Sequence, residues 1–93
     1  MEITEFQRLM RETYGTRDRA RGLEGTFAWF VEEVGELSRA LFRGEDVERR
    51  VEFADVFAWL ASLADQAGVD LAEAVQRYAQ GCPKCGSRPC RCV

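Results

Sequence analysis

The distribution of proline constrains the fold of this 93-residue chain more than any other feature of its sequence. Residues 1–81 contain no proline, whereas Pro83, Pro89 and all four cysteines lie within residues 82–93. Proline interrupts helices, and the proline-free part is rich in alanine, leucine, glutamate and arginine, so the sequence predicts an all-α fold. We therefore expect a helical domain over residues 1–81 and a short cysteine-bearing tail over residues 82–93.

Hydrophobic spacing and capping signals divide the proline-free part into four helices. Thr4 and Asp70 each stand three residues before a glutamine or glutamate, which is the pattern of a capping box at a helix start. Gly44 and Gly68 follow apolar stretches and predict helix ends. The polar residues 15–25 predict a loop. The expected helices cover residues 4–14, 26–43, 46–67 and 70–80.

The expected third helix is apolar on almost every side. Between residues 51 and 64 only Glu52, Asp55 and Ser62 are polar, a pattern typical of a buried helix. Glu52 and Asp55 are three residues apart and share one face, and buried carboxylates are costly unless a cation balances them. A chain of this length cannot cover such a helix alone, so we expect at least a homodimer.

The expected second helix carries a matching pair of acids, Glu33 and Glu36, beside its apolar stripe. Antiparallel packing around a turn at Gly44 would bring both acid pairs to one level. Four oxygen ligands without nitrogen or sulfur favour Mg²⁺ or Mn²⁺. The chain has no histidine, which excludes Ser-His-Asp triads and His-ligated metals. Each pair alone also suits a solvated helix face.

The acids form two motifs, EEVGEL at residues 32–37 and EFADV at residues 52–56. Together they resemble the EExxE and ExxD signature of the MazG-type nucleotide pyrophosphohydrolases, which belong to the all-α NTP pyrophosphatase superfamily. The resemblance covers residues 3–80 and implies a four-helix MazG-like bundle completed by dimerisation, as a dimer or a dimer of dimers. It also implies Mg²⁺-dependent hydrolysis of a (d)NTP or a non-standard NTP to the monophosphate and pyrophosphate by metal-activated water. The motifs do not separate these substrates from dUTP or phosphoribosyl-ATP.

The resemblance assigns roles to individual acids. The implied Mg²⁺ ligands are Glu33, Glu36, Glu52 and Asp55. Glu32 matches the first position of the motif, where it would position water or a second ion, although a place on the outer surface suits it equally. These five acids are the expected catalytic residues.

Three further side chains border the acids and are candidates for substrate binding. Arg49 precedes Glu52 by one turn and would stabilise the leaving pyrophosphate, with Arg50 as the alternative, although exposed arginines at a helix start are usually only solvated. Trp29 and Trp59 each lie four residues from an acid and would stack on the nucleobase. Both tryptophans also suit a core position.

The cysteine tail predicts a second metal site. Cys82, Cys85 and the following Gly86 form a zinc-knuckle turn, whereas Cys90 and Cys92 are closer together than in the usual pattern. Four thiolates can surround one tetrahedral Zn²⁺, and a site with no open position would be structural. A reduced, unstructured tail and a pair of disulfides are the alternatives, the disulfides being disfavoured in a cytosolic chain.

Charge and hydropathy limit the partners and the location. The net charge of −3 argues against a nucleic-acid polymer as ligand. The longest apolar run, residues 56–61, is far shorter than the ~20 residues that span a bilayer, and the first ten residues lack the order of a signal peptide. We expect a cytoplasmic protein without membrane contact. The alternatives are a non-catalytic zinc-tailed interaction module on a MazG-like bundle and a ferritin-like di-metal protein, which would need histidine.

Overall fold

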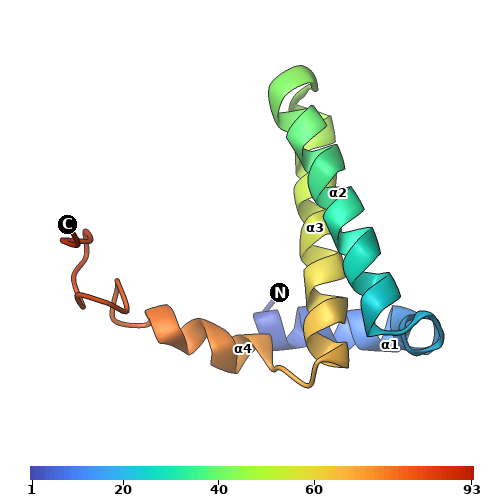
Figure 1. The fold of residues 1–93 in the computed structure, drawn as a ribbon, viewed down its shortest axis with the longest axis horizontal. Coiled ribbons are helices and arrows are strands. Elements are labelled where there is room, and N and C mark those ends of the chain that lie inside the picture. The colour runs from blue at the N-terminus through green and yellow to red at the C-terminus, as the bar shows by residue number, and fades with distance from the viewer.

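The computed structural model describes residues 1–93 and is helical, without strands. This confirms the predicted all-α fold. Figure 1 shows two long helices as an antiparallel pair that stands on a third, while the C-terminal part extends away to one side. The elements are α1 (Ile3–Arg21), α2 (Leu23–Arg43), α3 (Asp46–Gln66), α4 (Leu71–Ala74) and the 3₁₀-helix η1 (Val75–Tyr78).

A tight turn at Gly44 joins α2 to α3. The Gly44 N–H donates to the Ala40 carbonyl at 3.1 Å, and a Cβ at Gly44 would lie 2.9 Å from the same oxygen, so the turn requires glycine. A capping box then starts α3, in which the Glu48 carboxylate accepts the backbone N–H of Glu45 at 3.3 Å. The predicted antiparallel pairing of these two helices follows from this short connection.

The expected loop over residues 15–25 is wrong. Helix α1 continues to Arg21, and only Gly22, with φ 87°, separates it from α2. Side chains hold the junction: the Arg21 guanidinium donates to the Asp18 carboxylate at 2.9 Å and to the Thr26 hydroxyl at 3.2 Å. Asp18 and Thr26 are both buried. The arginines and glycines that suggest a loop therefore form a helix-to-helix junction.

The two predicted capping boxes have different outcomes. Thr4 lies inside α1, which begins one residue earlier without a side-chain cap, so this box is wrong. The Asp70 carboxylate does cap α4, accepting the backbone N–H of Ala72 at 2.9 Å and of Glu73 at 3.4 Å. Helix α4 passes into the 3₁₀-helix, which ends at Tyr78, slightly before the expected end.

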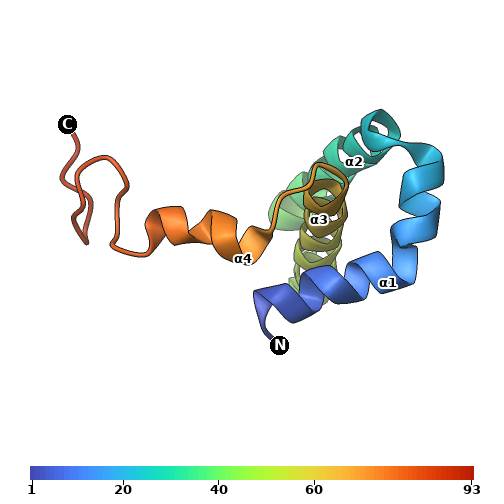
Figure 2. The same ribbon diagram turned by 90° about the horizontal axis from the view of Figure 1, so that it is seen from below.

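Side chains of α1 fasten the end of α3 and the start of α4. The Gln7 amide donates to the Val69 carbonyl at 2.8 Å and accepts the Leu71 N–H at 2.9 Å. The Arg11 guanidinium pairs with the Asp65 carboxylate at 2.7 Å. These contacts set α1 across the base of the α2–α3 pair (Figure 2).

The core of the single chain is small. Only nine of the 93 residues are buried, and the accessible surface is 7050 Å². A compact protein of this mass exposes roughly 5,500 Å². Helix α3 is therefore not covered within one chain, as its composition and the length of the chain lead us to expect. The exposed large apolar side chains on α2 and α3 include Phe27, Val31, Val34, Val51, Phe53 and Phe57.

None of these helices combines the length and the apolar character needed to cross a membrane.

Candidate metal centre

Three of the five predicted acids meet between α2 and α3. One carboxylate oxygen from each of Glu33, Glu52 and Asp55 lies within 4.8 Å of the other two. Glu33 and Asp55 are equally far from Gly44 along the chain, so the antiparallel hairpin brings them to the same level. The turn at Gly44 thus assembles a group of acids that are distant in sequence.

The acid cluster, defined as Glu33, Glu52 and Asp55, has no positive partner within the protein. None of its members takes part in an ion pair. The Glu52 Oε2 atom is buried and has no hydrogen-bond donor. An unpaired buried carboxylate oxygen is destabilising, and a divalent cation would satisfy it. Carboxylate oxygens are the ligands that Mg²⁺ and Mn²⁺ prefer, so the residues present fit such an ion.

The pKa of Glu33 reflects this concentration of negative charge. Burial raises the pKa of the Glu33 carboxyl above its usual value, and the neighbouring carboxylates of Asp55, Glu52, Glu36 and Glu32 raise it further. The cluster therefore favours a bound proton or a bound cation over the free carboxylates.

The raised pKa predicts a pH dependence of stability in the metal-free protein. Between its unfolded and folded pKa values the folded state holds more protons at Glu33, so stability should rise as pH falls through this range. In Glu33→Gln the side chain is already neutral, so this contribution disappears. Thermal melting in a chelator between pH 7 and pH 5 should show the variant more stable at pH 7 and the difference shrinking toward pH 5. A difference that grows on acidification would contradict the assignment.

The other two predicted acids lie outside the cluster. The Glu36 carboxylate pairs with Arg39 at 2.9 Å, and Glu32 is exposed. Glu36 and Glu52 nevertheless line one cavity of about 200 Å³. The side chains of Arg39 and Glu36 are 66% and 42% exposed, and such surface pairs contribute only ~0–1 kcal/mol. A cation could therefore recruit Glu36 at little cost, and the roles of Glu36 and Glu32 stay predictions.

Arg49 has a structural partner. Its Nε donates to the Ala40 carbonyl at 3.1 Å, as a second donor beside the Gly44 N–H. Arg50 pairs with Asp46 at 3.0 Å on the surface of the first turns of α3. Neither guanidinium bonds to the acid cluster, and a contact between Arg49 and the substrate stays a prediction.

The two tryptophans pack against each other. The rings of Trp29 and Trp59 are stacked with centroids 5.9 Å apart, and the Arg21 guanidinium lies 4.9 Å from the Trp59 ring. They join α2, α3 and the helix junction. Trp29 remains 46% exposed, so stacking on a nucleobase also stays a prediction.

A cavity beside the acids escaped the sequence interpretation. It has a volume of about 230 Å³, and Asp55 of the acid cluster forms part of its wall. Most of its other polar residues come from the stretch for which the sequence predicts a loop. They are spaced as residues on one face of a helix are, and this spacing is the signal that could have revealed them. The cavity is lined by Tyr14, Arg17, Asp18, Arg21, Asp55, Ala58, Trp59 and Ser62.

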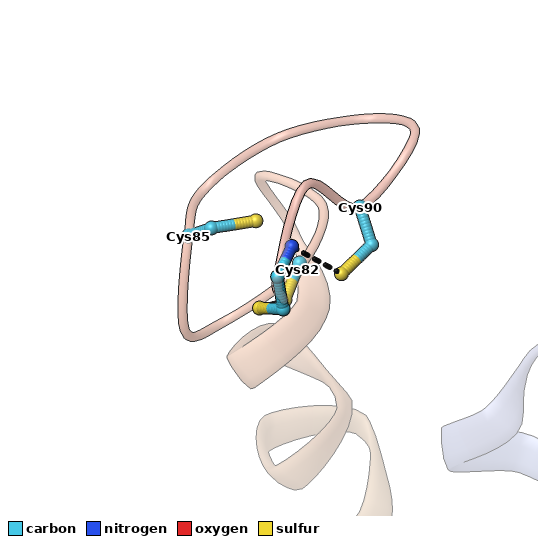
Figure 3. Close-up of side chains that lie close together, drawn as sticks. Cys82, Cys85 and Cys90 are labelled. Atoms are coloured by element: carbon cyan, nitrogen blue, oxygen red, sulfur yellow. Dashed lines mark hydrogen bonds between the residues drawn. The ribbon is translucent and has the colours of Figure 1, made fainter.

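The four cysteines form a second cluster in the tail. All four are free thiols, and their sulfur atoms lie within 4.8 Å of one another. In Figure 3 the Cys85 sulfur points toward Cys82 and Cys90. The backbone N–H of Arg91 donates to the Cys85 sulfur at 3.3 Å, and such N–H groups lower the pKa of Cys85 to about 6.

A family model described as the MazG nucleotide pyrophosphohydrolase domain matches residues 21–88, which is more than half of the chain. The match includes α2, α3, all five predicted acids and the first two cysteines. No match is found among curated proteins.

Proposed function

The chain belongs to the MazG nucleotide pyrophosphohydrolase family, and we propose that it hydrolyses a (d)NTP or a non-standard NTP to the monophosphate and pyrophosphate, with Mg²⁺ or Mn²⁺ as cofactor. The observation that carries this proposal is the acid cluster, with its unpaired Glu52 oxygen, beside a cavity lined by arginines. We place catalysis in residues 1–81, because the acid cluster and every residue that lines the cavity beside it lie there.

Glu33, Glu52 and Asp55 would hold the metal ion, and Glu36 would join them after leaving Arg39. A bound divalent ion supplies positive charge to the phosphate oxygens and lowers the pKa of a nearby water. In this proposal a water molecule, and not a protein side chain, would be the nucleophile. Direct attack of water on the α-phosphorus therefore requires only positioning and charge stabilisation.

The cavity beside the acid cluster is lined by two arginines, whose positive charge suits the phosphates of the substrate. Arg17 is exposed and pairs with no acid, so its guanidinium is free to bind phosphate oxygens. Arg21 already bonds Asp18 and covers Trp59, so it would instead fix the wall of the cavity. A triphosphate approaching three carboxylates would be repelled without such charges. Arg17 thus complements the metal ion on the side of α1.

Replacing Arg17 with glutamine should lower kcat/KM for the triphosphate by roughly 10- to 100-fold, the effect of losing one charge-assisted hydrogen bond of ~1.5–3 kcal/mol. The fold should be unaffected, because the side chain is exposed. The matched control is Arg8→Gln, on the same helix but lining a separate cavity. Equal steady-state kinetics for both variants would remove Arg17 from the substrate site.

Product analysis tests the proposed reaction. The full chain should release pyrophosphate and monophosphate in equal amounts from at least one member of a panel of standard, deoxy and non-standard triphosphates that also includes dUTP and phosphoribosyl-ATP. Release should require Mg²⁺ or Mn²⁺ and stop in EDTA. Orthophosphate as the first product would contradict the reaction. Metal binding without turnover of any member would favour the non-catalytic module.

A further inference from the structure

The cysteine cluster is a site that the proposed hydrolysis does not use. It consists of Cys82, Cys85, Cys90 and Cys92, none of which is disulfide-bonded. The sulfurs of Cys82 and Cys92 are 3.6 Å apart. In a tetrahedral zinc site with Zn–S bonds of ~2.3 Å, neighbouring sulfurs are ~3.8 Å apart. The thiols are therefore already close to the spacing that a Zn²⁺ ion requires.

The tail around these cysteines has no core of its own. No residue from 79 to 93 is buried. Within residues 82–93 two backbone hydrogen bonds close the turn, from the Cys82 N–H to the Ser87 carbonyl at 3.1 Å and from the Gly86 N–H to the Cys82 carbonyl at 2.6 Å. Such sparse contacts cannot offset the conformational entropy lost on ordering a dozen residues. A conformation that gathers four sulfurs without burying apolar surface needs another source of stability.

Backbone groups also prepare the sulfurs for a cation. The Arg91 N–H donates to the Cys85 sulfur, and the Cys92 N–H donates to the Cys90 sulfur, both at 3.3 Å. Figure 3 shows the Cys90 sulfur at the end of such a bond. Such outer N–H groups orient the sulfur atoms of a metal site. The short loop therefore supplies four ligands and part of their supporting hydrogen bonds.

We propose that Cys82, Cys85, Cys90 and Cys92 bind one Zn²⁺ ion tetrahedrally and that this ion folds the tail. Four thiolates leave no position for water or substrate, so the site is structural. Soft sulfur ligands select Zn²⁺ over Mg²⁺, whereas the oxygen ligands between α2 and α3 do the reverse. The tail also extends away from α2 and α3 (Figure 1). The zinc site is thus independent of the proposed hydrolysis.

Metal analysis of the full chain, purified with a thiol reductant, tests the composition of the site. We expect about one zinc per chain and no iron. Replacement by Co²⁺ should give the strong near-ultraviolet absorption of cobalt–thiolate bonds. Cys85→Ser should lower zinc affinity by at least ~100-fold. Ser87→Ala is the matched control, because Ser87 contributes only backbone groups to the turn.

Amide NMR of the same proteins tests whether the ion folds the tail. Removing zinc should move the signals of residues 82–93 to random-coil positions while those of α1, α2 and α3 persist. Mn²⁺ binding at the acid cluster should be unchanged in Cys85→Ser. Iron in place of zinc, disulfides in reductant-free mass spectra with no bound metal, or a tail that stays ordered without metal would each overturn the proposal.

Discussion

Replacing Asp55 with asparagine should lower pyrophosphate release by at least ~100-fold while the helices stay folded. The substitution would keep the size of the side chain but remove a charge from the acid cluster, in which three carboxylates lie within 4.8 Å of one another. A weaker charge holds Mg²⁺ less tightly and offsets less of the phosphate repulsion. Glu52→Gln should have a similar effect, because its buried Oε2 has no other partner.

The same substitutions should not destabilise the metal-free protein. Neighbouring carboxylates already raise the pKa of Glu33, so removing one of them relieves repulsion. The melting temperature in EDTA should equal or exceed that of the wild type, which separates loss of a ligand from loss of the fold. Glu24→Gln is the control, since Glu24 is an exposed acid in the first turn of the same helix as Glu33. Wild-type turnover in both Asp55→Asn and Glu52→Gln would place catalysis elsewhere.

The acid cluster could be predicted because it depends on two neighbouring helices and the short turn between them. Glu52 and Asp55 are conspicuous in an apolar helix, and one glycine turn suffices to place Glu33 opposite them. The position of Glu36 could not be predicted in this way. Glu36 shares a helix face with Glu33, but its carboxylate pairs with Arg39 on the next turn at 2.9 Å. A choice between two partners depends on side-chain rotamers, which spacing does not determine.

The loop predicted at the junction between α1 and α2 is wrong because the prediction follows the composition of residues 15–25 and not their helical periodicity. Its glycines and arginines are typical of loops. In the structure, Tyr14, Arg17, Asp18 and Arg21 line one face of a continuous helix, and Arg21 bonds to both Asp18 and Thr26. These side-chain contacts within the junction stabilise helix where the composition suggests a loop. The cavity formed by this face was missed for the same reason.

The apolar character of α3 was recognised, but sequence alone does not say what covers it. Within one chain Phe53 is 55% and Val51 49% exposed. The radius of gyration is 15.4 Å, against ~12 Å for a compact domain of this length. The extended tail accounts for part of the excess surface. Exposed apolar side chains on α2 and α3 account for another part, and the whole excess of roughly 1,500 Å² is greater than the ~800 Å² that each partner buries in a standard interface. We infer that a second copy of the chain covers it.

Phe53→Glu should therefore convert the inferred assembly, which we propose to be a dimer or a dimer of dimers, into smaller species. A two-fold interface contains the Phe53 ring of both copies, and burying each ring contributes ~2–3 kcal/mol. Losing both contributions should weaken association by roughly 10³- to 10⁴-fold. Light scattering at micromolar concentration should show the change in mass. Tyr78→Glu is the control, because Tyr78 is similarly exposed, at 63%, but lies outside α2 and α3.

Because only nine residues of one chain are buried, a separated protomer should have little stability, so Phe53→Glu should also lower the melting temperature. If the variant unfolds altogether, the wild type provides the second measurement. A protein whose folding depends on assembly melts at a temperature that rises with its concentration. A wild-type mass equal to one chain, with melting independent of concentration, would show that the exposed faces of α2 and α3 are not covered by another copy.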